Sequence, residues 1–215
     1  MKLGVLASGR GSNLEAVLAA GIGVAVVISN RPGVRALEVA AAHAVPVHVL
    51  RRADHADDGA VRDRAIGETL SAAGVDLALL AGYDSLLRPS YFAAFAGRTI
   101  NIHPSLLPAH GGAGMVGLAV HRSVLAAGDA ETGVTIHDVT SDLDAGPILV
   151  QARVPVLRGD DAEALAARVL IAEHRLLVAT LQQLLGSAPA EESAGPRPDR
   201  GSADTSAASG LNYGR

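Results

Sequence analysis

Two polar side chains, Asn101 and His103, stand two positions apart in the stretch Asn-Ile-His-Pro near the middle of the chain. Residues two apart in an extended segment point to the same side, so the amide and the imidazole would share one face while Ile102 turns into the core. Pro104 then ends regular strand pairing, because proline lacks a backbone donor and restricts the residue before it. The pattern predicts a strand that stops abruptly to present two polar groups.

A loop further along the chain offers carboxylate partners for this pair. Residues 140–148 read Thr-Ser-Asp-Leu-Asp-Ala-Gly-Pro-Ile and contain Asp142 and Asp144. A carboxylate beside a histidine raises the imidazole pKa and favours the imidazolium, and such a cation with an amide donor could stabilise an oxyanion at an attacked carbonyl. The alternative is that the two aspartates form Asx turns in a solvated loop and that His103 is hydrogen-bonded into the sheet. His137 is either a satisfied core histidine or a support for the site.

The stretch Ser-Gly-Arg-Gly-Ser-Asn, residues 8–13, joins an apolar strand to a helical pattern. A dinucleotide fingerprint would need glycine where Leu14 stands and an acidic residue where the second strand ends at Asn30. A P-loop would need a lysine followed by serine or threonine. The turn instead suits one phosphate monoester, bound by backbone N–H groups at the positive end of a helix. An ordinary turn with Ser12 or Asn13 as the N-cap is the alternative.

Short apolar runs alternate with helical patterns, which predicts a mostly parallel sheet flanked by helices. We expect strands at 2–7, 23–29, 46–50, 76–81 and 98–103, with helices after the glycine turn, at 33–43 and at 58–73. Two β-rich runs at 132–139 and 146–156 predict an antiparallel pair, and a last helix should run from about 160 to about 185. The fold class is therefore α/β, with one Rossmann-like domain over 1–186. The Ser-, Gly- and Pro-rich segment 187–215 is predicted to be a disordered tail.

Composition excludes several classes of function. The 215 residues carry a formal net charge of -4 and include five aromatic side chains, so neither a basic field nor stacking platforms for nucleic acid are expected. There is no cysteine, which excludes disulfides and thiolate chemistry, and no histidine spacing indicates a metal site. No apolar run approaches the ~18 residues of a membrane span. The N-terminus lacks a signal-peptide pattern, so we expect a cytoplasmic protein.

Several stretches, in order along residues 7–174, together resemble the phosphoribosylglycinamide formyltransferases. They read ASGRGSNL, LAGYDSLL, INIHPSLLPAHGGAGMVGLAVH, TGVTIHDVTSDLDAGPILVQ and AEH. The resemblance implies a single formyltransferase domain. It also implies transfer of the formyl group of 10-formyltetrahydrofolate, the cosubstrate, to the amine of glycinamide ribonucleotide in de novo purine biosynthesis, through a tetrahedral intermediate. It implies no metal, and a monomer or homodimer that binds these small molecules and neither nucleic acid nor membrane.

The resemblance also implies roles for individual residues. Asn101 and His103 would polarise the formyl carbonyl and hold the oxyanion, while Asp144 would keep His103 protonated and help a water molecule to move a proton. His137 would support this centre. The residues implied to bind the substrate phosphate and ribosylglycinamide are Gly11, Ser12, Asn13 and Glu173. Those implied to bind folate are Asp84, Ser85, Leu86, Leu87, Asn101, Thr140, Ser141, Asp142, Leu143 and Asp144.

The chain departs from the family pattern in three places. Ser85 stands where the family often has an arginine. Gly59 falls near the arginine thought to meet the folate tail, with Arg62 and Arg64 close by. The segment 109–121 is longer and richer in glycine than is common, and we expect it to form a flexible lid.

Rival functions differ in features that a sequence can show. A methionyl-tRNA formyltransferase would carry a C-terminal barrel and a basic surface, and a formyltetrahydrofolate hydrolase would carry a regulatory domain before the first strand. A sugar-nucleotide formyltransferase would lack the glycine turn. A non-catalytic relative would lack Asn101, His103 or Asp144, and all three are present.

Overall fold

One mixed sheet runs through the computed structural model, which describes residues 1–186. Its seven strands lie in the order β3-β2-β1-β4-β5-β6-β7. They are β1 (Leu3–Leu6), β2 (Val24–Ser29), β3 (Val47–Val49), β4 (Leu77–Leu80), β5 (Arg98–His103), β6 (Glu131–Asp138) and β7 (Ile148–Pro155). The first five pair in parallel, whereas β6 pairs antiparallel with both β5 and β7. The predicted parallel sheet with an antiparallel C-terminal pair is confirmed.

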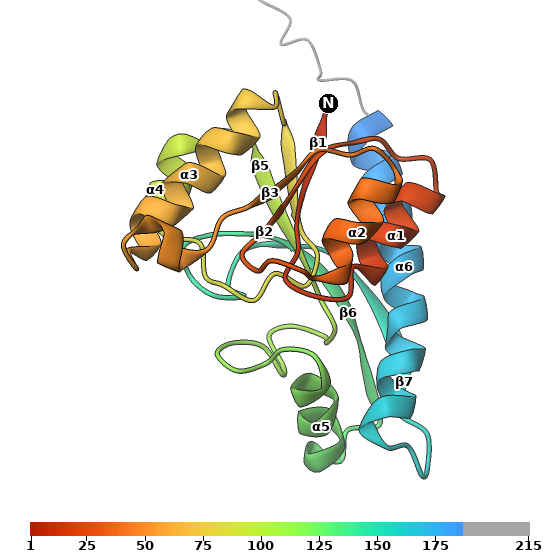
Figure 1. Ribbon diagram of the computed structural model, residues 1–215. Coiled ribbons are helices and arrows are strands. Elements are labelled where there is room, and N and C mark those ends of the chain that lie inside the picture. Colours follow the sequence, from red (N-terminus) through yellow and green to blue (C-terminus); the bar gives the residue numbers. More distant parts are fainter. Residues whose placement is uncertain (187–215) are drawn as a thin grey trace, which may run out of the picture.

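Helices cover both faces of the sheet (Figure 1). One face carries α1 (Ser12–Ala19), α2 (Arg35–Ala42) and α6 (Ala162–Gly186), and the other carries α3 (Gly59–Ala72) and α4 (Pro89–Ala94). A 3-10 turn, η1 (Arg52–His55), precedes α3, and α5 (Leu118–Ala127) lies below the sheet in Figure 1. The predicted α/β class is therefore confirmed as a three-layer arrangement.

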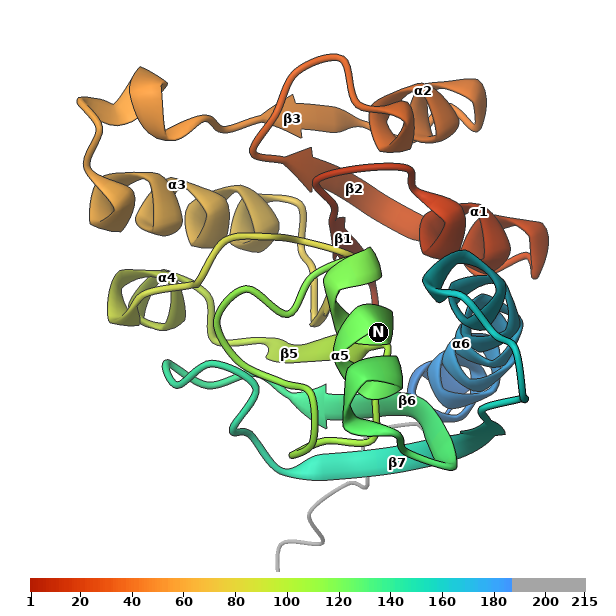
Figure 2. The ribbon, with the colours of Figure 1, turned by 90° about the horizontal axis from the view of Figure 1, so that it is seen from below.

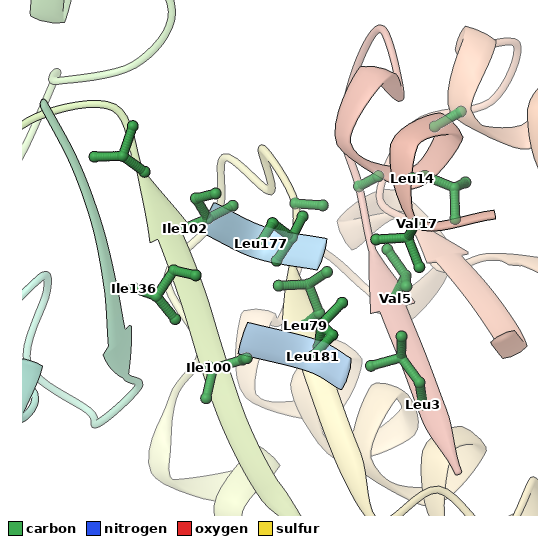
Figure 3. Close-up of a cluster of buried hydrophobic side chains, with 14 of the residues drawn as sticks. Leu3, Val5, Leu14, Val17, Leu79, Ile100, Ile102, Ile136, Leu177 and Leu181 are labelled. Atoms are coloured by element: carbon green, nitrogen blue, oxygen red, sulfur yellow. The ribbon is translucent and has the colours of Figure 1, made fainter. Parts of the chain in front are cut away.

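Alternation along the strands divides the core into two clusters, because successive side chains of a strand point to opposite faces. In β1, Leu3 and Val5 belong to the cluster under α1, α2 and α6, while Leu6 belongs to the cluster under α3 and α4. Figure 3 shows the first cluster, whose labelled members are Leu3, Val5, Leu14, Val17, Leu79, Ile100, Ile102, Ile136, Leu177 and Leu181. As predicted, Ile102 faces the core between Asn101 and His103.

The strand order creates a crevice at the carboxyl edge of the sheet. The chain passes from β1 outward to β2 and β3, then returns to place β4 on the other side of β1. Ligands of open α/β sheets bind outside the carboxyl ends of the strands at such a switch point. Figure 2 views the molecule from this side, with α5 in front of the sheet. The loops after β1, β4 and β5 therefore meet where a site is expected.

Two helices were not predicted. The six-residue α4 starts at a proline in its first turn and is too short for a periodic pattern. The ten-residue α5 begins at Leu118, inside the segment expected to be a flexible lid. The expectation of a flexible lid is therefore wrong for residues 118–121, where apolar residues recur with helical spacing.

The remaining sequence predictions concern the chain ends and the membrane. The predicted domain boundary falls at the last described residue, and the predicted tail lies outside the described residues. Within residues 1–186, no helix combines the length and apolar character needed to cross a membrane.

Candidate active site

A cavity of about 580 Å³ opens at the carboxyl edge of the sheet. Its walls come from the loops after β1, β4 and β5, the start of α5, the loop 139–144 and the face of α6 near Glu173. The structure brings every predicted site residue to this cavity except Ser141, which is exposed and does not line it.

Asn101 is held by His137, which lies opposite it on β6. His137 Nδ1 is 2.8 Å from the backbone oxygen of Asp138, which can only accept, so Nδ1 carries the ring proton. His137 Nε2 then accepts from Asn101 Nδ2 at 3.1 Å. Because one amide hydrogen of Asn101 is taken by this bond, the other can be donated to a ligand. His137 is thus both a satisfied buried histidine and a support for Asn101.

His103 is buried at the end of β5, with 5% of its surface exposed. Its Nε2 is 2.9 Å from the carbonyl oxygen of His110, so Nε2 carries a hydrogen and Nδ1 faces Asp144 Oδ2 at 3.9 Å. Burial lowers the pKa of His103 below its ordinary value, and the carbonyl bond and the charge of Asp144 raise it only in part. Desolvation therefore outweighs the carboxylate in this structure, and the role expected of Asp144 in keeping the ring protonated stays a prediction.

Asp144 lies between the two histidines. Its Oδ1 is 3.8 Å from His137 Nε2, and its Oδ2 accepts a 2.8 Å hydrogen bond from the backbone N–H of Gly112. The backbone of Asp144 has a φ of 52°, a left-handed conformation that side-chain-bearing residues seldom adopt. This unusual backbone aims the carboxylate into the centre and ties the loop after β5 to it.

The glycine turn presents a helix N-terminus that no side chain caps. Gly11 is the N-cap of α1, with a φ of 73° and no side-chain cap bond. A Cβ at Gly11 would lie 2.7 Å from the Cα of Ala36, so glycine is needed for both conformation and packing. The alternative that Ser12 or Asn13 serves as an ordinary N-cap is therefore wrong. With no capping side chain, the first N–H groups of α1 are available to an anion.

Glu173 projects from α6 into the same end of the cavity and is 8% exposed. Burial raises the pKa of Glu173 to about 7, with hydrogen bonding from Asn13 and the charge of Arg10 lowering it in part. Asn13 keeps a buried Oδ1 without a hydrogen-bond partner. A polar ligand at the end of α1 would therefore meet an acid that titrates near neutrality and an unpartnered amide oxygen.

The loop after β4 forms another wall of the cavity and adjoins the glycine turn, where the backbone N–H of Asp84 donates to Ser8 Oγ at 3.1 Å. The amide of Asn30 donates to Asp84 Oδ1 at 2.7 Å and to Ser85 Oγ at 2.8 Å, and Arg31 pairs with the Asp84 carboxylate. The Leu87 side chain is buried in the core, so Leu87 can contact a ligand only through its backbone. These bonds make the loop a fixed wall rather than a set of free side chains.

Exposed leucines add apolar surface to the cavity walls formed by this loop and by the loop 140–144. Leu86 is 45% exposed and Leu143 48% exposed, and both line the cavity. Thr140 Oγ1 and the backbone of Asp142 are joined by hydrogen bonds of 3.2 and 3.3 Å that close the turn before Leu143. The wall suits a flat, partly apolar ligand bound through backbone groups.

The departure at position 59 has a structural explanation. A Cβ at Gly59 would lie within van der Waals overlap of the Arg88 guanidinium, so Arg88 fills the space beside the glycine. Arg88 Nη1 is 3.2 Å from Asp63 Oδ2, and Arg62 pairs with the other oxygen of the same buried carboxylate. Of the two arginines suggested by the sequence, Arg62 is therefore a buried structural partner, whereas Arg64 is exposed.

Sequence reasoning missed His121 as a cavity residue. It is 4% exposed, its Nδ1 is buried without a hydrogen-bond partner, and burial lowers the pKa of its ring. The start of α5 lines the cavity, so a prediction of that helix would have placed His121 there. The helix was not predicted. Within residues 1–186, no cluster of three or more possible metal-ligating side chains has the placement of a metal site.

Comparison with known proteins identifies the family. The model of the formyl transferase family matches residues 1–181. The chain belongs to this family. The phosphoribosylglycinamide formyltransferase of Mycobacterium tuberculosis is 44% identical over 189 residues, which cover 85% of this chain and 84% of that protein. That of Escherichia coli is 38% identical over 183 residues, covering 82% and 83% of the two chains.

Solved structures in the formyl transferase family agree with the fold. Glycinamide ribonucleotide transformylase 1 from Symbiobacterium toebii superposes with a TM-score of 0.80 at 40% identity, covering 86% of this chain and 88% of that one. The phosphoribosylglycinamide formyltransferase of Brucella melitensis has a TM-score of 0.77, also at 40% identity. In this formyl transferase, the shared fold places the cavity at the carboxyl edge of the sheet.

Proposed function

We propose that this formyl transferase is a phosphoribosylglycinamide formyltransferase, which passes the formyl group of 10-formyltetrahydrofolate to the amine of glycinamide ribonucleotide in purine biosynthesis. The observation that carries the proposal is one cavity with three unlike parts. An uncapped helix N-terminus, a wall of backbone groups and leucines, and the side chains of Asn101, His103 and Asp144 all line it. Relatives that cover most of this chain bear this name.

The glycine turn would bind the phosphate of glycinamide ribonucleotide. The N–H groups of Ser12 and Asn13 at the start of α1 would donate to the phosphate, with the positive end of the helix behind them. Glu173 would accept hydrogen bonds from the ribosylglycinamide portion. A substrate bound here could also donate a hydrogen bond to Asn13 Oδ1, which is buried and has no partner within the protein. Buried polar atoms are normally hydrogen-bonded.

The loop after β4 and the loop 140–144 would hold the folate cosubstrate. Backbone groups of Asp84–Leu87 would bind the pterin, and Leu86 and Leu143 would cover its faces. Asn30 and Arg31 hold the Asp84 side chain, so that residue shapes the wall without projecting freely. Serine at position 85 is compatible with this role because its backbone is the binding element.

Asn101 and His103 would stabilise the oxyanion that forms when the substrate amine attacks the formyl carbon. The free amide hydrogen of Asn101 is donated to the formyl oxygen, and His103 Nδ1 lies on the same face of β5. Negative charge developing on that oxygen raises the pKa of the adjacent imidazole. A neutral ring therefore takes up a proton from solvent as the oxyanion forms and returns it to solvent when the intermediate collapses. Asp144 would receive the proton released by the attacking amine and pass it, through water, to the leaving folate nitrogen.

Positioning and electrostatics are sufficient for this chemistry, and no residue of the chain needs to form a covalent bond to the formyl group. A cytoplasmic location and a monomeric or homodimeric state are parts of the same proposal. A formyltetrahydrofolate hydrolase would share Asn101, His103 and Asp144, but it would have no use for the uncapped helix end beside Glu173.

The decisive experiment follows folate absorbance during formyl transfer from 10-formyltetrahydrofolate to glycinamide ribonucleotide. Acceptor-dependent turnover that falls by at least about 100-fold in His103→Ala would establish the proposal. The matched control is His48→Ala, which removes an exposed histidine from β3 at the far edge of the sheet and should leave turnover unchanged. Consumption of the formyl-folate without acceptor would indicate the hydrolase instead, and no consumption at all would indicate a binding relative.

A further inference from the structure

The ring of His110 is bound at both nitrogens by residues of α5 and the turn that follows it. His110 Nδ1 lies 2.8 Å from Ser123 Oγ, and His110 Nε2 lies 2.7 Å from Asp129 Oδ2. Since a carboxylate accepts, Nε2 carries a hydrogen, and Nδ1 of the neutral ring can accept from the serine hydroxyl. Ser123 lies in α5 and Asp129 directly follows its C-cap Gly128, so the ring is fastened to the last two turns of that helix.

The backbone of the same residue contacts the catalytic centre. The His110 carbonyl oxygen accepts the 2.9 Å hydrogen bond from His103 Nε2. His110 has a φ of 54°, a conformation that residues with side chains seldom adopt. Ser105 Oγ adds a 2.6 Å hydrogen bond to the neighbouring carbonyl of Ala109. The direction of the His110 carbonyl is thus set by a rare backbone conformation that the ring contacts hold in place.

This arrangement fixes which nitrogen of His103 faces the cavity. With Nε2–H bonded to the His110 carbonyl, the atom on the side of Asp144 is Nδ1. If the carbonyl turned away, the proton could move to Nδ1 in the neutral ring, and Nδ1 would no longer be free to take up a proton during the reaction. The tautomer of a functional histidine is commonly set by the hydrogen bond at its other nitrogen.

We propose that Asp129, His110 and Ser123 form a clamp that directs the His110 carbonyl and thereby fixes the tautomer and orientation of His103. His110 is in this sense a positioning residue, and the consequence for turnover rests on the proposed function. The three side chains also have the connectivity of a nucleophilic triad. None of the three lines the cavity, however, and Ser123 is bound to the nitrogen opposite the one that such a serine usually contacts. The clamp therefore acts through His103.

The test uses three variants in the full chain. His110→Gly removes the ring, and glycine adopts a positive φ without strain. Ser123→Ala and Asp129→Asn each remove one ring partner and keep His110. The control is Asp57→Gly, which replaces another residue with a φ of 55°, exposed and outside the cavity. This control separates loss of the clamp from simple relief at a positive-φ position.

In formyl transfer, we expect His110→Gly to lower kcat by about 10- to 100-fold, by analogy with the loss of groups that orient metal-bound histidines. The KM for glycinamide ribonucleotide should change little, because the glycine turn is not altered. The kcat of Ser123→Ala and of Asp129→Asn should fall by a smaller factor than that of His110→Gly. The kcat of Asp57→Gly should equal that of the wild type. In a His103→Ala background, His110→Gly should cause no further loss. A further loss as large as that in the wild-type background would overturn the proposal.

The pH profile gives a second readout. The carbonyl bond favours the protonated His103 ring, so the ionisation assigned to His103 should move to lower pH in Asp129→Asn and Ser123→Ala. The groups that act on His103 electrostatically are Asp144, His137, His110 and His121, and these two variants retain all of them. An unchanged profile together with wild-type kcat would contradict the clamp.

A measurement independent of turnover separates this proposal from the proposed function. Ring-nitrogen NMR shifts at about pH 8, where His103 is neutral, report the tautomer directly, and His103→Ala assigns the signals. The expected result is a single Nε2–H form in the wild type and a mixture in His110→Gly. If wild-type protein shows that form but transfers no formyl group, the function fails and the clamp stands. If His110→Gly keeps the wild-type tautomer, the clamp fails.

Discussion

Asn101 and His137 are joined by a 3.1 Å hydrogen bond between Nδ2 and Nε2, and the bond has a fixed direction because His137 Nδ1 donates to the carbonyl of Asp138. An asparagine amide can otherwise rotate and offer either oxygen or nitrogen. The histidine therefore makes Asn101 a donor toward the cavity. Two adjacent strands, β5 and β6, supply the pair across an antiparallel register, so the sheet itself positions the donor.

Replacing Asn101 by alanine should remove this donor without disturbing substrate binding at the glycine turn. Loss of one preorganised oxyanion donor lowers kcat by about 100- to 1,000-fold in enzymes where it has been isolated. Steady-state kinetics should show that loss with a small change in the KM for glycinamide ribonucleotide. His137→Phe, which keeps the amide but frees it to rotate, should lose less than Asn101→Ala. The reverse order would mean that His137, rather than Asn101, meets the reacting group.

His103→Ala and Asp144→Asn should both reduce turnover while leaving phosphate binding intact. Removing a group that transfers a proton in the transition state costs about 100- to 10,000-fold. Calorimetric titration with glycinamide ribonucleotide should give near-wild-type affinity for both variants, since the end of α1 is unchanged. A variant that lost affinity and turnover together would show a disturbed cavity, and near-normal turnover in His103→Ala would contradict the mechanism.

Removing the side chains at the start of α1 should have the opposite kinetic signature. The double variant Ser12→Ala with Asn13→Ala keeps the backbone N–H groups but loses a hydroxyl and an amide, each hydrogen bond to a charged group contributing about 1.5–3 kcal/mol. The KM for glycinamide ribonucleotide should therefore rise by at least about tenfold, while kcat at saturating substrate stays close to the wild type. A fall in kcat with unchanged KM would place the phosphate elsewhere.

The sequence predicted the strands and the polar centre well because both depend on local patterns. Alternation around Asn101 and His103 sufficed to place their side chains on one face of β5, and apolar runs sufficed for the sheet. The location of α5 was not predictable in the same way. Glycines at 111, 112, 114 and 117 precede it, and their composition suggested a mobile segment although the helix begins at Leu118.

The protonation of His103 could not be read from the sequence either. A neighbouring carboxylate suggested a raised pKa, but burial proved the larger effect, and burial depends on every element around the ring. The same holds for His110, whose proposed role comes from contacts with Ser123 and Asp129, residues that follow it in the chain after a glycine-rich stretch. Long-range contacts of this kind depend on how the loop after β5 folds back on α5, for which the local sequence gives no rule.

Glu173 should make stability fall as the pH rises. An unfolded glutamate ionises with a pKa near 4.5, whereas burial raises the pKa of Glu173 to about 7 in the folded chain. Between these values the folded state retains a proton that the unfolded state has released, so the free energy of unfolding decreases as the pH increases. The contribution is complete below pH 4.5 and is lost above pH 7. The difference between the two pKa values corresponds to about 3 kcal/mol in the free energy of unfolding.

Glu173→Gln tests this assignment, because glutamine imitates the protonated acid at every pH. Urea unfolding from pH 5 to pH 8 should show the wild type losing stability relative to Glu173→Gln, with the two nearly equal near pH 4.5 and the variant more stable by up to about 3 kcal/mol at pH 8. Glu68→Gln, at an exposed position of α3, should follow the wild type throughout. Parallel curves for the wild type and Glu173→Gln would mean that the carboxyl is already ionised in the folded chain. Added glycinamide ribonucleotide should reduce the difference at pH 8, since a ligand that hydrogen-bonds the carboxylate offsets the cost of burying it.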